Sequence, residues 1–540
     1  MSEVLKANEE VYIGNLLSIK VERYLLFFTS AIALVVLVLF AFQPANILVR
    51  YVSDDAYYYL QVAKHIAAGQ GPTFDGITWT TGFHPLYAIV LATIDKLFEP
   101  SRDTFVALGM LFNVLCFFVT GGLLYSSARL LWSASAGRWA GIIWFSNAHT
   151  MLLVATGLEG ALYAACLALL LNLVVRTIIS RKISMLYAIY SGIYLGFASA
   201  LCVLSRTDAL LIMALFGLYL LFFSSSTISK RFVRAACFGI VTLLPMFAWF
   251  WYCQKSTGST LQGSAEMKTL WRCMETDGYG LWKNVLFGID IFQTWISKSI
   301  FKIPLLKYVL LFSIILLFKK GVLQSRRITR PLLHILWISL ILLGLAYSIF
   351  LPKVWTWYYA PSLVFLTMFT AGGIYSLLFV NEKNRLQNYV SRILPIILLL
   401  SAVESYGHLA IKSIRGRNRY QTETLAVAEW MANNLSPNAR VGAWNSGIYS
   451  WYSGLQTVNL DGLINNDIPQ LFKNNELVSD YIVKMGIEYV VDNAEYMEWH
   501  CPKLTTNDYS VIYYHEGRDG HSKTVWKINK HIDSGPILVH

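Results

Sequence analysis

The first residues along the chain that could carry out chemistry are two adjacent carboxylates, Asp54 and Asp55. A carboxylate can act as a general base that takes the proton from a hydroxyl nucleophile, and the pair could also hold a divalent cation. Residues 55–68 have helical propensity, with apolar and aromatic side chains on one side. The two acids therefore have a simpler alternative role, as an acidic cap at the N-terminus of that helix.

Cations and further acids occur in four short polar motifs later in the chain. Carboxylates beside cations can deprotonate an acceptor and stabilise a phosphate leaving group. Each motif also has a simpler interpretation: Arg206 pairs with Asp208, His84 caps a loop, and the aromatic residues form an interfacial belt. An acid between two apolar runs, such as Glu159, has fewer structural uses. The motifs are Thr80–Leu86 with His84, Ala155–Gly160 with Glu159, Leu204–Asp208 with Arg206 and Asp208, and Pro352–Pro361 with Lys353, Trp357, Tyr358 and Tyr359.

The elements that must position these residues are apolar. Of the 540 residues, 56% are hydrophobic and only 14% are charged. Apolar runs of about 20 residues, each long enough to span a bilayer, follow one another between residues 24 and 409. This pattern predicts a polytopic α-helical membrane protein with about 11–13 transmembrane helices. Eleven spans are expected to start near residues 24, 104, 139, 158, 186, 207, 235, 303, 333, 358 and 391.

The basic residues predict the orientation of these spans. The net charge of +12 lies in clusters beside the apolar runs, which is typical of cytoplasmic loops and argues against a nucleic-acid partner. The N-terminus is then cytoplasmic, and the polar motifs all face outward, where one cavity could collect them. Two segments are expected not to span: the short apolar stretch Pro85–Phe98 and the amphipathic stretch Leu281–Phe301. The clusters lie at residues 129–138, 176–182, 230–234, 319–330 and 383–392.

The composition changes to polar residues with turn signals after about residue 410. We therefore divide the chain into a transmembrane catalytic domain, residues 1–410, whose first outer loop is residues 45–84, and an outer domain, residues 411–540. Helical and strand patterns alternate in the second part, which predicts a small soluble α/β domain. Helices are expected at residues 423–433 and 477–485, and strands at residues 440–443, 457–460 and 488–491.

The seven cysteines show no metal-ligand spacing. Cys253 and Cys273 flank one predicted outer loop and could form a disulfide, which would leave Cys501 unpaired. The sequence offers no complete set of ligands for a cofactor. The one candidate is a divalent cation, which Asp54 and Asp55 could bind.

Together these motifs resemble the GT-C superfamily of integral membrane glycosyltransferases, which use polyprenyl-phosphate sugars. The resemblance is greatest to bacterial arabinofuranosyltransferases and more distant to the lipid A aminoarabinose transferases and the protein O-mannosyltransferases. It is carried by the acid pair in the first outer loop with its surface helix, by Gly82–Leu86, and by the motifs around Glu159, Arg206 and Trp357. Two stretches near the C-terminus, Val441–Tyr449 and Val458–Asn465, are similar to the outer domain of many of these enzymes.

The resemblance implies a role for each motif. Asp54 would be the catalytic base, and Asp55 would orient the acceptor or a cation. Glu159, Asp208, Trp357, Tyr358 and Tyr359 would line the substrate cavity, and His84, Arg206 and Lys353 would bind the donor phosphate. His84 is a departure, because the aminoarabinose-transferring relatives carry a lysine there and histidine is only partly charged near neutral pH.

The expected protein is thus an inverting glycosyltransferase of the bacterial inner membrane. It would move a sugar, by resemblance a pentofuranose such as arabinofuranose, although a hexose is also compatible, from a polyprenyl-phosphate donor. The acceptor would be a cell-envelope glycan, lipid or protein on the periplasmic or extracellular face, where the C-terminal domain would also lie. Two alternatives stay open: a transporter or flippase for lipid-linked sugars, and a catalytically silent scaffold of the same fold.

Overall fold

The computed structural model describes residues 2–180, 184–223, 227–299, 329–379, 385–415, 419–505, 507–517 and 521–529. Contacts within the chain divide it into two compact units, and each unit is built from three separate stretches of sequence. The first unit comprises Met1–Phe42, Met110–Phe247 and Gly278–Ile411. The second comprises Gln43–Gly109, Ala248–Asp277 and Lys412–His540.

Among the described residues, eight helices are long and apolar enough to cross a membrane. This finding confirms the predicted polytopic α-helical fold. The span expected from about residue 303 lies outside the described residues, and the one expected from residue 207 is a shorter apolar helix, Ala209–Phe222. The eight candidate spans are Ile19–Ala41, Arg102–Leu131, Gly160–Ile179, Met185–Ser205, Ile228–Thr257, Arg330–Phe350, Thr356–Leu377 and Ile393–Ile411.

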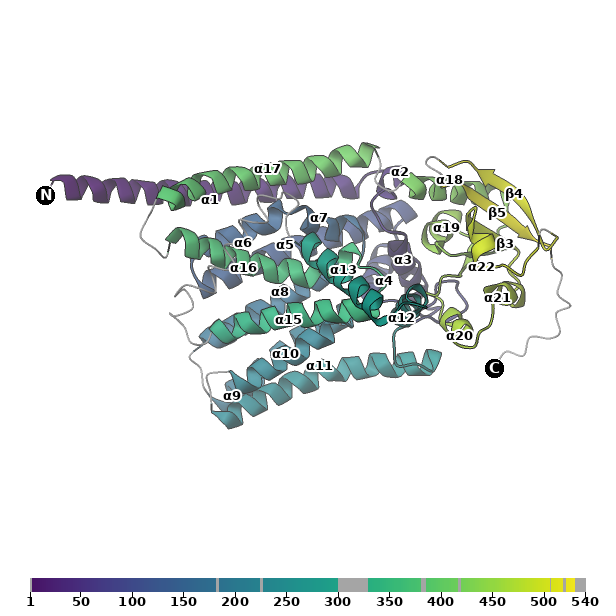
Figure 1. The fold of residues 1–540 in the computed structure, drawn as a ribbon, viewed down its shortest axis with the longest axis horizontal. Helices are drawn as coiled ribbons and strands as arrows, with labels where there is room; N and C mark the ends of the chain where they lie inside the picture. Colours follow the sequence, from purple (N-terminus) through teal and green to yellow (C-terminus); the bar gives the residue numbers. More distant parts are fainter. Residues whose placement is uncertain are drawn as a thin grey trace. The chain divides into compact units, whose positions relative to one another are not determined.

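The first unit consists of helices packed side by side. Its elements are α1 (Ser2–Ala41), α6 (Ala134–Ser146), α7 (Ala148–Ala155), α8 (Gly160–Ile179), α9 (Met185–Ser205), α10 (Ala209–Phe222), α13 (Leu281–Ser299), α15 (Thr329–Phe350), the 3-10 helix η2 (Thr356–Tyr359) and α16 (Ala360–Phe379). The helices α5 (Arg102–Leu131), α11 (Ile228–Thr257) and α17 (Arg385–Arg415) have residues in both units. Helix α6 lies beside α1 and α16 (Figure 1), α8 packs against α9, and α13 packs against α15.

A buried acid joins α1 to α6. The Glu22 carboxylate accepts hydrogen bonds from Ser135 Oγ at 2.6 Å and Trp139 Nε1 at 3.1 Å, and it pairs with Arg138 Nε at 2.7 Å. A carboxylate can be buried between helices only when its oxygens are satisfied in this way. The contact therefore fixes how these two helices pack.

The prediction of one span from about residue 139 is wrong, because the chain breaks there into α6 and α7. Asn147 lies between the two helices in an extended conformation, and its side-chain oxygen accepts a hydrogen bond from the His149 N–H at 3.0 Å. Asparagine is a favoured N-cap because it satisfies an N–H group that the new helix leaves without a partner. The cap ends one helix and starts the next.

The second unit contains a five-stranded mixed sheet with the strand order β2-β1-β3-β5-β4. Strand β1 (Arg440–Ala443) runs parallel to β2 (Gln456–Asn459) and β3 (Tyr489–Asn493), whereas β5 (Lys523–Ile528) is antiparallel to β3 and β4 (Tyr509–His515). This sheet confirms the predicted α/β character of the C-terminal region. The helices of the unit are α2 (Ala45–Leu48), α3 (Asp54–Ala67), α4 (Pro85–Phe98), α12 (Gly263–Glu275), α18 (Arg419–Asn434), α19 (Ser446–Ser453), α20 (Asp467–Lys473), α21 (Val478–Lys484) and α22 (Tyr496–His500).

The sheet has an apolar cluster on each face. Val490 and Trp526 belong to one cluster, and their chain neighbours Val491 and Val525 belong to the other. Successive side chains of a strand point to opposite faces, so strands buried on both faces read as continuous apolar runs. Helix α18 supplies Val427 and Met431 to the second cluster.

Several elements of the second unit match the prediction. Helix α3 begins with both acids in its first turn, and α4 has the predicted bounds with Pro85 in its first turn. Proline suits that position because its missing N–H would have no partner there. The Cys253–Cys273 disulfide is not formed: Cys253 is buried and Cys273 is exposed, and all seven cysteines are free.

Candidate functional site

Asp54 lies at the beginning of two helices at once. It is in the first turn of α3, and its carboxylate accepts hydrogen bonds from the N–H groups of Gly447 at 3.0 Å and Ile448 at 2.8 Å. Both amides belong to the first turn of α19, where a negative charge is favourable. Gly447 is needed for this approach, because a Cβ atom there would lie 2.2 Å from the Asp54 carbonyl oxygen.

The environment of Asp54 favours its protonated form. Burial raises its pKa to about 7, the two amide hydrogen bonds oppose this shift, and repulsion from Asp55 adds to it. A carboxyl group with a pKa near neutrality can both accept and release a proton under physiological conditions. This is the property required of a general base, although buried structural acids can show it too.

A third carboxylate, Asp461, belongs to the same acidic cluster. Burial raises its pKa to about 8, and repulsion from Asp55 and Asp54 contributes. Its oxygens accept hydrogen bonds from the Leu463 N–H at 2.8 Å and the Tyr58 hydroxyl at 3.4 Å. Asp461 is not among the site residues predicted from the sequence. The available signal is its place just after β2, since functional residues gather at the carboxyl ends of parallel strands.

The loop around Asp461 is held by an asparagine. Asn459 donates from Nδ2 to Ser446 Oγ at 2.9 Å and to the Trp444 carbonyl at 3.3 Å, and its Oδ1 accepts the Gly462 N–H at 2.9 Å. Trp444 and Ser446 follow β1, so Asn459 ties together the carboxyl ends of two adjacent parallel strands. The acidic cluster is thereby built on a rigid edge of the sheet.

A buried lysine also acts on this cluster. Lys523 lies on β5; burial lowers its pKa, and the charges of Asp492, Glu423 and Asp54 oppose that shift. Asp492 itself accepts hydrogen bonds from the backbone N–H of Asn445 at 2.8 Å and from its Nδ2 at 3.0 Å. Neither Lys523 nor Asp492 was singled out from the sequence, because a lysine in a strand looks like an ordinary surface residue.

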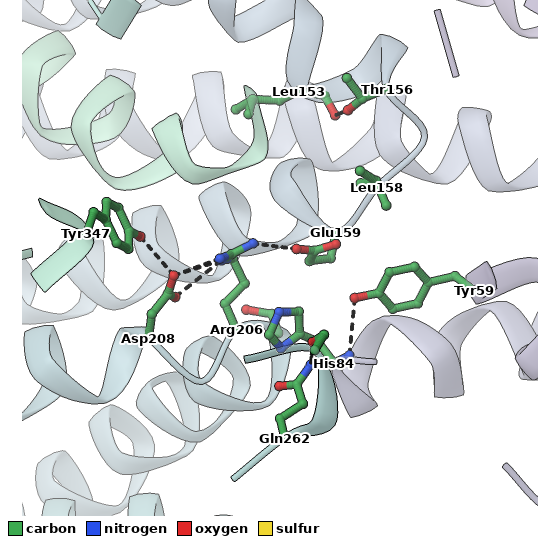
Figure 2. A network of polar contacts seen from close by, with 12 residues as sticks. Tyr59, His84, Leu153, Thr156, Leu158, Glu159, Arg206, Asp208, Gln262 and Tyr347 are labelled. Carbon is green, nitrogen blue, oxygen red and sulfur yellow. Dashed lines mark hydrogen bonds and ion pairs between the residues drawn. The ribbon is translucent and has the colours of Figure 1, made fainter. Parts of the chain in front are cut away.

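The motif that contains His84 is held mainly through its backbone. Figure 2 shows the Tyr59 hydroxyl accepting the His84 N–H, at 3.2 Å. His84 precedes α4 without a side-chain cap bond, so the expected capping role of its side chain is not seen. Thr81 Oγ1 donates to Asn466 Oδ1 at 3.1 Å, and a Cβ at Gly82 would lie 2.0 Å from the Leu463 carbonyl oxygen. The small residues of this motif therefore let it pack against residues 463–466.

In the first unit, Arg206 forms the centre of an ionic network. Its Nη1 donates to Glu159 Oε1 at 2.6 Å, and its Nη2 donates to Asp208 Oδ2 at 2.7 Å. Figure 2 shows the guanidinium between these two carboxylates, with Tyr347 donating to Asp208 at 2.8 Å. Arg206 and Glu159 are 3% and 2% exposed, so each carries a buried charge that the other compensates.

Helix ends bring this network together. Glu159 stands just before α8, Arg206 just after α9, and Asp208 just before α10. Side chains at helix termini can approach one another where the chain changes direction. The Arg206 guanidinium also lies 4.2 Å from the centre of the Tyr358 ring, a cation–π contact. Arg206 thus pairs with Asp208, as the simpler sequence-based interpretation expected, and Glu159 is a second partner.

The remaining predicted residues lie on or beside η2. Trp357, Tyr358 and Tyr359 are buried, and the Tyr358 carbonyl accepts a hydrogen bond from Trp295 Nε1 at 3.1 Å. Lys353 is exposed. The aromatic residues thus pack within the first unit rather than forming an exposed belt, and Lys353 is the accessible cation of this motif.

A divalent cation fits Asp54 poorly. Both of its oxygens face backbone N–H donors, whose positive ends would repel a metal ion at the same oxygens. Within the described ranges, no three His, Cys, Asp or Glu side chains form a cluster suited to a metal. The reaction proposed below therefore assigns no step to a metal ion.

Solved structures show the same fold. ArnT from Cupriavidus metallidurans bound to undecaprenyl phosphate aligns with a TM-score of 0.56 and 13% identity, over 93% of this chain and 98% of that one. The Archaeoglobus fulgidus oligosaccharyltransferase, in complex with Zn and sulfate, aligns with a TM-score of 0.58 and 13% identity, over 92% and 72%. The same archaeal enzyme, AglB, in complex with an inhibitory peptide and a dolichol-phosphate, gives 0.56 and 12%, over 96% and 75%.

These likenesses establish the predicted architecture: the chain has the GT-C fold and is a multi-pass membrane protein. Residues 412–528 match a family model described as a domain of unknown function, DUF8728. A comparison with curated protein sequences found no match.

Proposed function

We propose that this protein is a glycosyltransferase that uses a polyprenyl-phosphate sugar and a carboxylate base. The observation that carries the proposal is Asp54, a carboxyl group held in place by two backbone amides with a pKa raised to about 7. The fold supports it, because ArnT was solved with undecaprenyl phosphate and AglB with a dolichol-phosphate. A lipid phosphate is the leaving group that an acceptor hydroxyl, activated by such a base, would displace.

In the proposed reaction, the acceptor hydroxyl gives its proton to Asp54 and attacks the anomeric carbon of the donor. The bond between that carbon and the phosphate oxygen breaks as the new glycosidic bond forms, and the polyprenyl phosphate leaves with the electron pair. A single displacement of this kind inverts the anomeric configuration. Asp55, next to the base, orients the acceptor, and the negative charges of Asp55 and Asp492 raise the basicity of Asp54.

The developing phosphate charge needs a cation. Among the three sequence-based candidates, Arg206 is already paired with two carboxylates, and His84 is held through its backbone. Lys353 is exposed and forms no ion pair among the described residues, so we assign the donor phosphate to it first. Glu159 and Asp208 then serve to hold Arg206 rather than to contact the substrate.

We further propose that transfer takes place on the outer face of a bacterial inner membrane, with the N-terminus in the cytoplasm. The distribution of basic residues supports this orientation. A pentofuranose such as arabinofuranose is the favoured sugar on the resemblance of the motifs, and a cell-envelope glycan, lipid or protein is the acceptor.

The test uses the full chain in lipid nanodiscs. Decaprenyl-phosphate arabinofuranose, undecaprenyl-phosphate aminoarabinose and undecaprenyl-phosphate mannose are supplied in turn, with and without a cell-envelope extract as the source of acceptor. We expect one donor to release free polyprenyl phosphate only when the extract is present. No release from any donor would contradict the proposal.

A transporter of lipid-linked sugars is the rival function, since intramembrane acids and arginines also mark substrate paths. The buried Glu159–Arg206 pair is the observation that favours it. Reconstituted vesicles with a fluorescent lipid-linked sugar separate the two functions: a transporter moves the intact donor between leaflets, whereas the proposed enzyme cleaves it.

A further inference from the structure

The second unit contains a basic cavity that the proposed reaction does not use. Its volume is about 240 Å³, and it lies where the end of α3, the start of α5 and the end of α19 meet. We call it the Lys64–Arg102 pocket, after the two cations in its wall. Its wall includes Gln61, Lys64, His65, Arg102, Trp451 and Gly454.

Two side chains give this pocket a positive charge. Lys64 lies with its Nζ 5.9 Å from the centre of the Trp451 ring, and Arg102 donates from Nη1 to the Tyr452 carbonyl at 3.3 Å. Both are exposed, and none of the described residues lining the pocket is acidic. Gly454 makes room for the arginine, because a Cβ there would lie 2.4 Å from Arg102 Nη2.

The histidine of the pocket is part of its wall rather than a third cation. His65 Nδ1 lies 2.8 Å from the Thr73 carbonyl and its Nε2 lies 3.1 Å from Gln61 Nε2. When Nδ1 donates to the carbonyl, Nε2 accepts from the glutamine amide, which is the arrangement of a neutral imidazole. Burial also lowers the pKa of His65, in agreement with the neutral form.

The rest of the wall suits a sugar. Gln61 and Gln70 contribute amide groups that can exchange hydrogen bonds with sugar hydroxyls. Trp451 is buried against Phe105 and supports the wall from below. Neutral polar groups and two cations together match a sugar that carries a negative charge. A neutral sugar would leave the two cations without a function in binding.

The pocket also lies at a defined distance from the acid pair. Lys64 follows Asp54 by ten residues in the same helix, and α3 packs against α19, whose first turn contacts Asp54 and whose end reaches the pocket. At 1.5 Å per residue this separation is about 15 Å along the helix axis.

We propose that the Lys64–Arg102 pocket binds an anionic sugar of the acceptor, a sugar phosphate or a uronate, about 15 Å from the hydroxyl that receives the transferred sugar. This inference rests on the proposed function and adds the class of acceptor to it: an acidic glycan of at least a few sugar units. The pocket selects the acceptor and takes no part in bond breaking.

The competing explanation is structural. Cations near a helix C-terminus interact favourably with its carbonyl groups, and Arg102 does contact one. If capping were the whole role, replacing Lys64 would lower the thermal stability of the protein without changing ligand affinity. Lys64 is the better probe, because Arg102 donates the hydrogen bond to Tyr452, whereas Lys64 contributes a cation–π approach to Trp451 and a charge near Asp95.

The test measures binding to the full chain in nanodiscs by isothermal titration calorimetry. The probes are trigalacturonic acid, glucose 6-phosphate and the neutral trisaccharide maltotriose. We expect at least one anionic probe to bind and maltotriose not to bind, and Lys64→Gln to weaken the anionic probe about fivefold, as for one partly exposed charge pair. Lys96→Gln is the matched control, since it removes another exposed lysine that does not line the pocket.

The two anionic probes distinguish the source of the charge. Binding of glucose 6-phosphate alone assigns a phosphate, binding of trigalacturonic acid alone assigns a carboxylate, and either result supports the inference. Binding of neither probe, equal binding of maltotriose, or equal affinity in Lys64→Gln and the parent would overturn it. Anion binding without any transfer activity would instead count against the proposed function alone.

Discussion

The two units of this protein each contain a cluster of buried or half-buried acids, and the two clusters are satisfied in different ways. Glu159 and Asp208 of the first unit share the guanidinium of Arg206, at 2.6 and 2.7 Å. Asp54 of the second unit accepts two backbone amides instead and lies within range of two other acids, Asp55 and Asp461.

This difference suggests that the acids of the first unit stabilise the fold, whereas Asp54 takes part in the reaction. A carboxylate that forms short, charge-assisted hydrogen bonds to a buried guanidinium is fixed in position by that contact. A carboxyl group raised to a pKa of about 7 by burial and neighbouring acids takes up and releases protons near neutral pH. We therefore expect changes in the first cluster to affect mainly stability, and changes in the second to affect mainly catalysis.

The largest expected effect is on transfer. Replacing Asp54 by Asn removes the proton acceptor and should lower the rate of polyprenyl phosphate release by about 10²–10⁴-fold. Asparagine also turns an NH₂ group toward an α19 amide, so part of the loss would be structural. The matched control is Gly447→Ala, which disturbs the same contact but keeps the acid. If both variants lost activity equally, Asp54 would be only a helix cap.

The complementary change in the first unit is Arg206→Met. It leaves Glu159 and Asp208 without their cation, and breaking a buried ion pair in this way costs about 3–5 kcal/mol. We expect a marked fall in the unfolding temperature of the purified protein, and partial recovery in the double variant Arg206→Met, Glu159→Gln. Unchanged stability in the single variant would show that the network is dispensable for the fold.

The rate of transfer should depend on pH through the Asp54 carboxyl group. A base must be deprotonated to act, so the rate should rise with pH and reach half its maximum near pH 7, the raised pKa of Asp54, rather than near pH 4. Below that midpoint we expect about a tenfold loss for each pH unit. If the transfer rate did not change between pH 5 and pH 8, Asp54 would not be the base of the reaction.

Asp461 allows the same comparison to be made through stability. Its pKa is higher in the folded protein, about 8, than the ordinary value of 3.8, so the folded state retains a proton that the unfolded chain releases. The contribution of the protonated Asp461 carboxyl group to the free energy of unfolding is therefore fully present below pH 4 and is lost as pH rises through 8. We expect Asp461→Asn to raise the free energy of unfolding at pH 8 by about 1 kcal/mol and to have less effect at pH 5. The reverse order would contradict the assigned environment.

The smallest effect concerns the edge of the first cluster. Tyr347→Phe removes the hydroxyl that donates to Asp208 at 2.8 Å but keeps the ring packed against Tyr358. The expected loss is about 1 kcal/mol of stability, the usual value of one hydrogen bond. Transfer activity measured at saturating donor should stay within twofold of the parent, whereas a larger loss would place Tyr347 in contact with substrate.

Much of the fold could be predicted from local patterns. The spans follow from the length of their apolar runs, and α3, α4 and β1 follow from periodicity and turn signals over fewer than twenty residues. Strands β4 and β5 were missed although they contain β-branched and aromatic residues, because the polar positions between them resembled a loop. The helix break at Asn147 was missed because apolar residues continue on both sides of it.

The candidate site was only partly predictable. The motifs around Asp54, Glu159 and Arg206 stood out because charges within or beside apolar runs are rare. Asp461, Asp492 and Lys523 could not be recognised, since each is an ordinary polar residue until the sheet buries it. The pairing of Arg206 with Glu159, 47 residues away, could likewise not be predicted from either motif.

The sequence alone determined that the chain crosses a membrane many times and where most of its helices lie. It also indicated which charged residues are candidates for a function. These features could be predicted because the length of an apolar run and its periodicity are properties of neighbouring residues. The tertiary structure decided which of those acids pair with a cation and which do not, and it joined Gln43–Gly109 and Ala248–Asp277 to the C-terminal region in one compact unit. Those outcomes depend on contacts between residues up to about 400 positions apart, such as Asp54 with Ile448. The pKa of an acid follows from its burial and its neighbours in space.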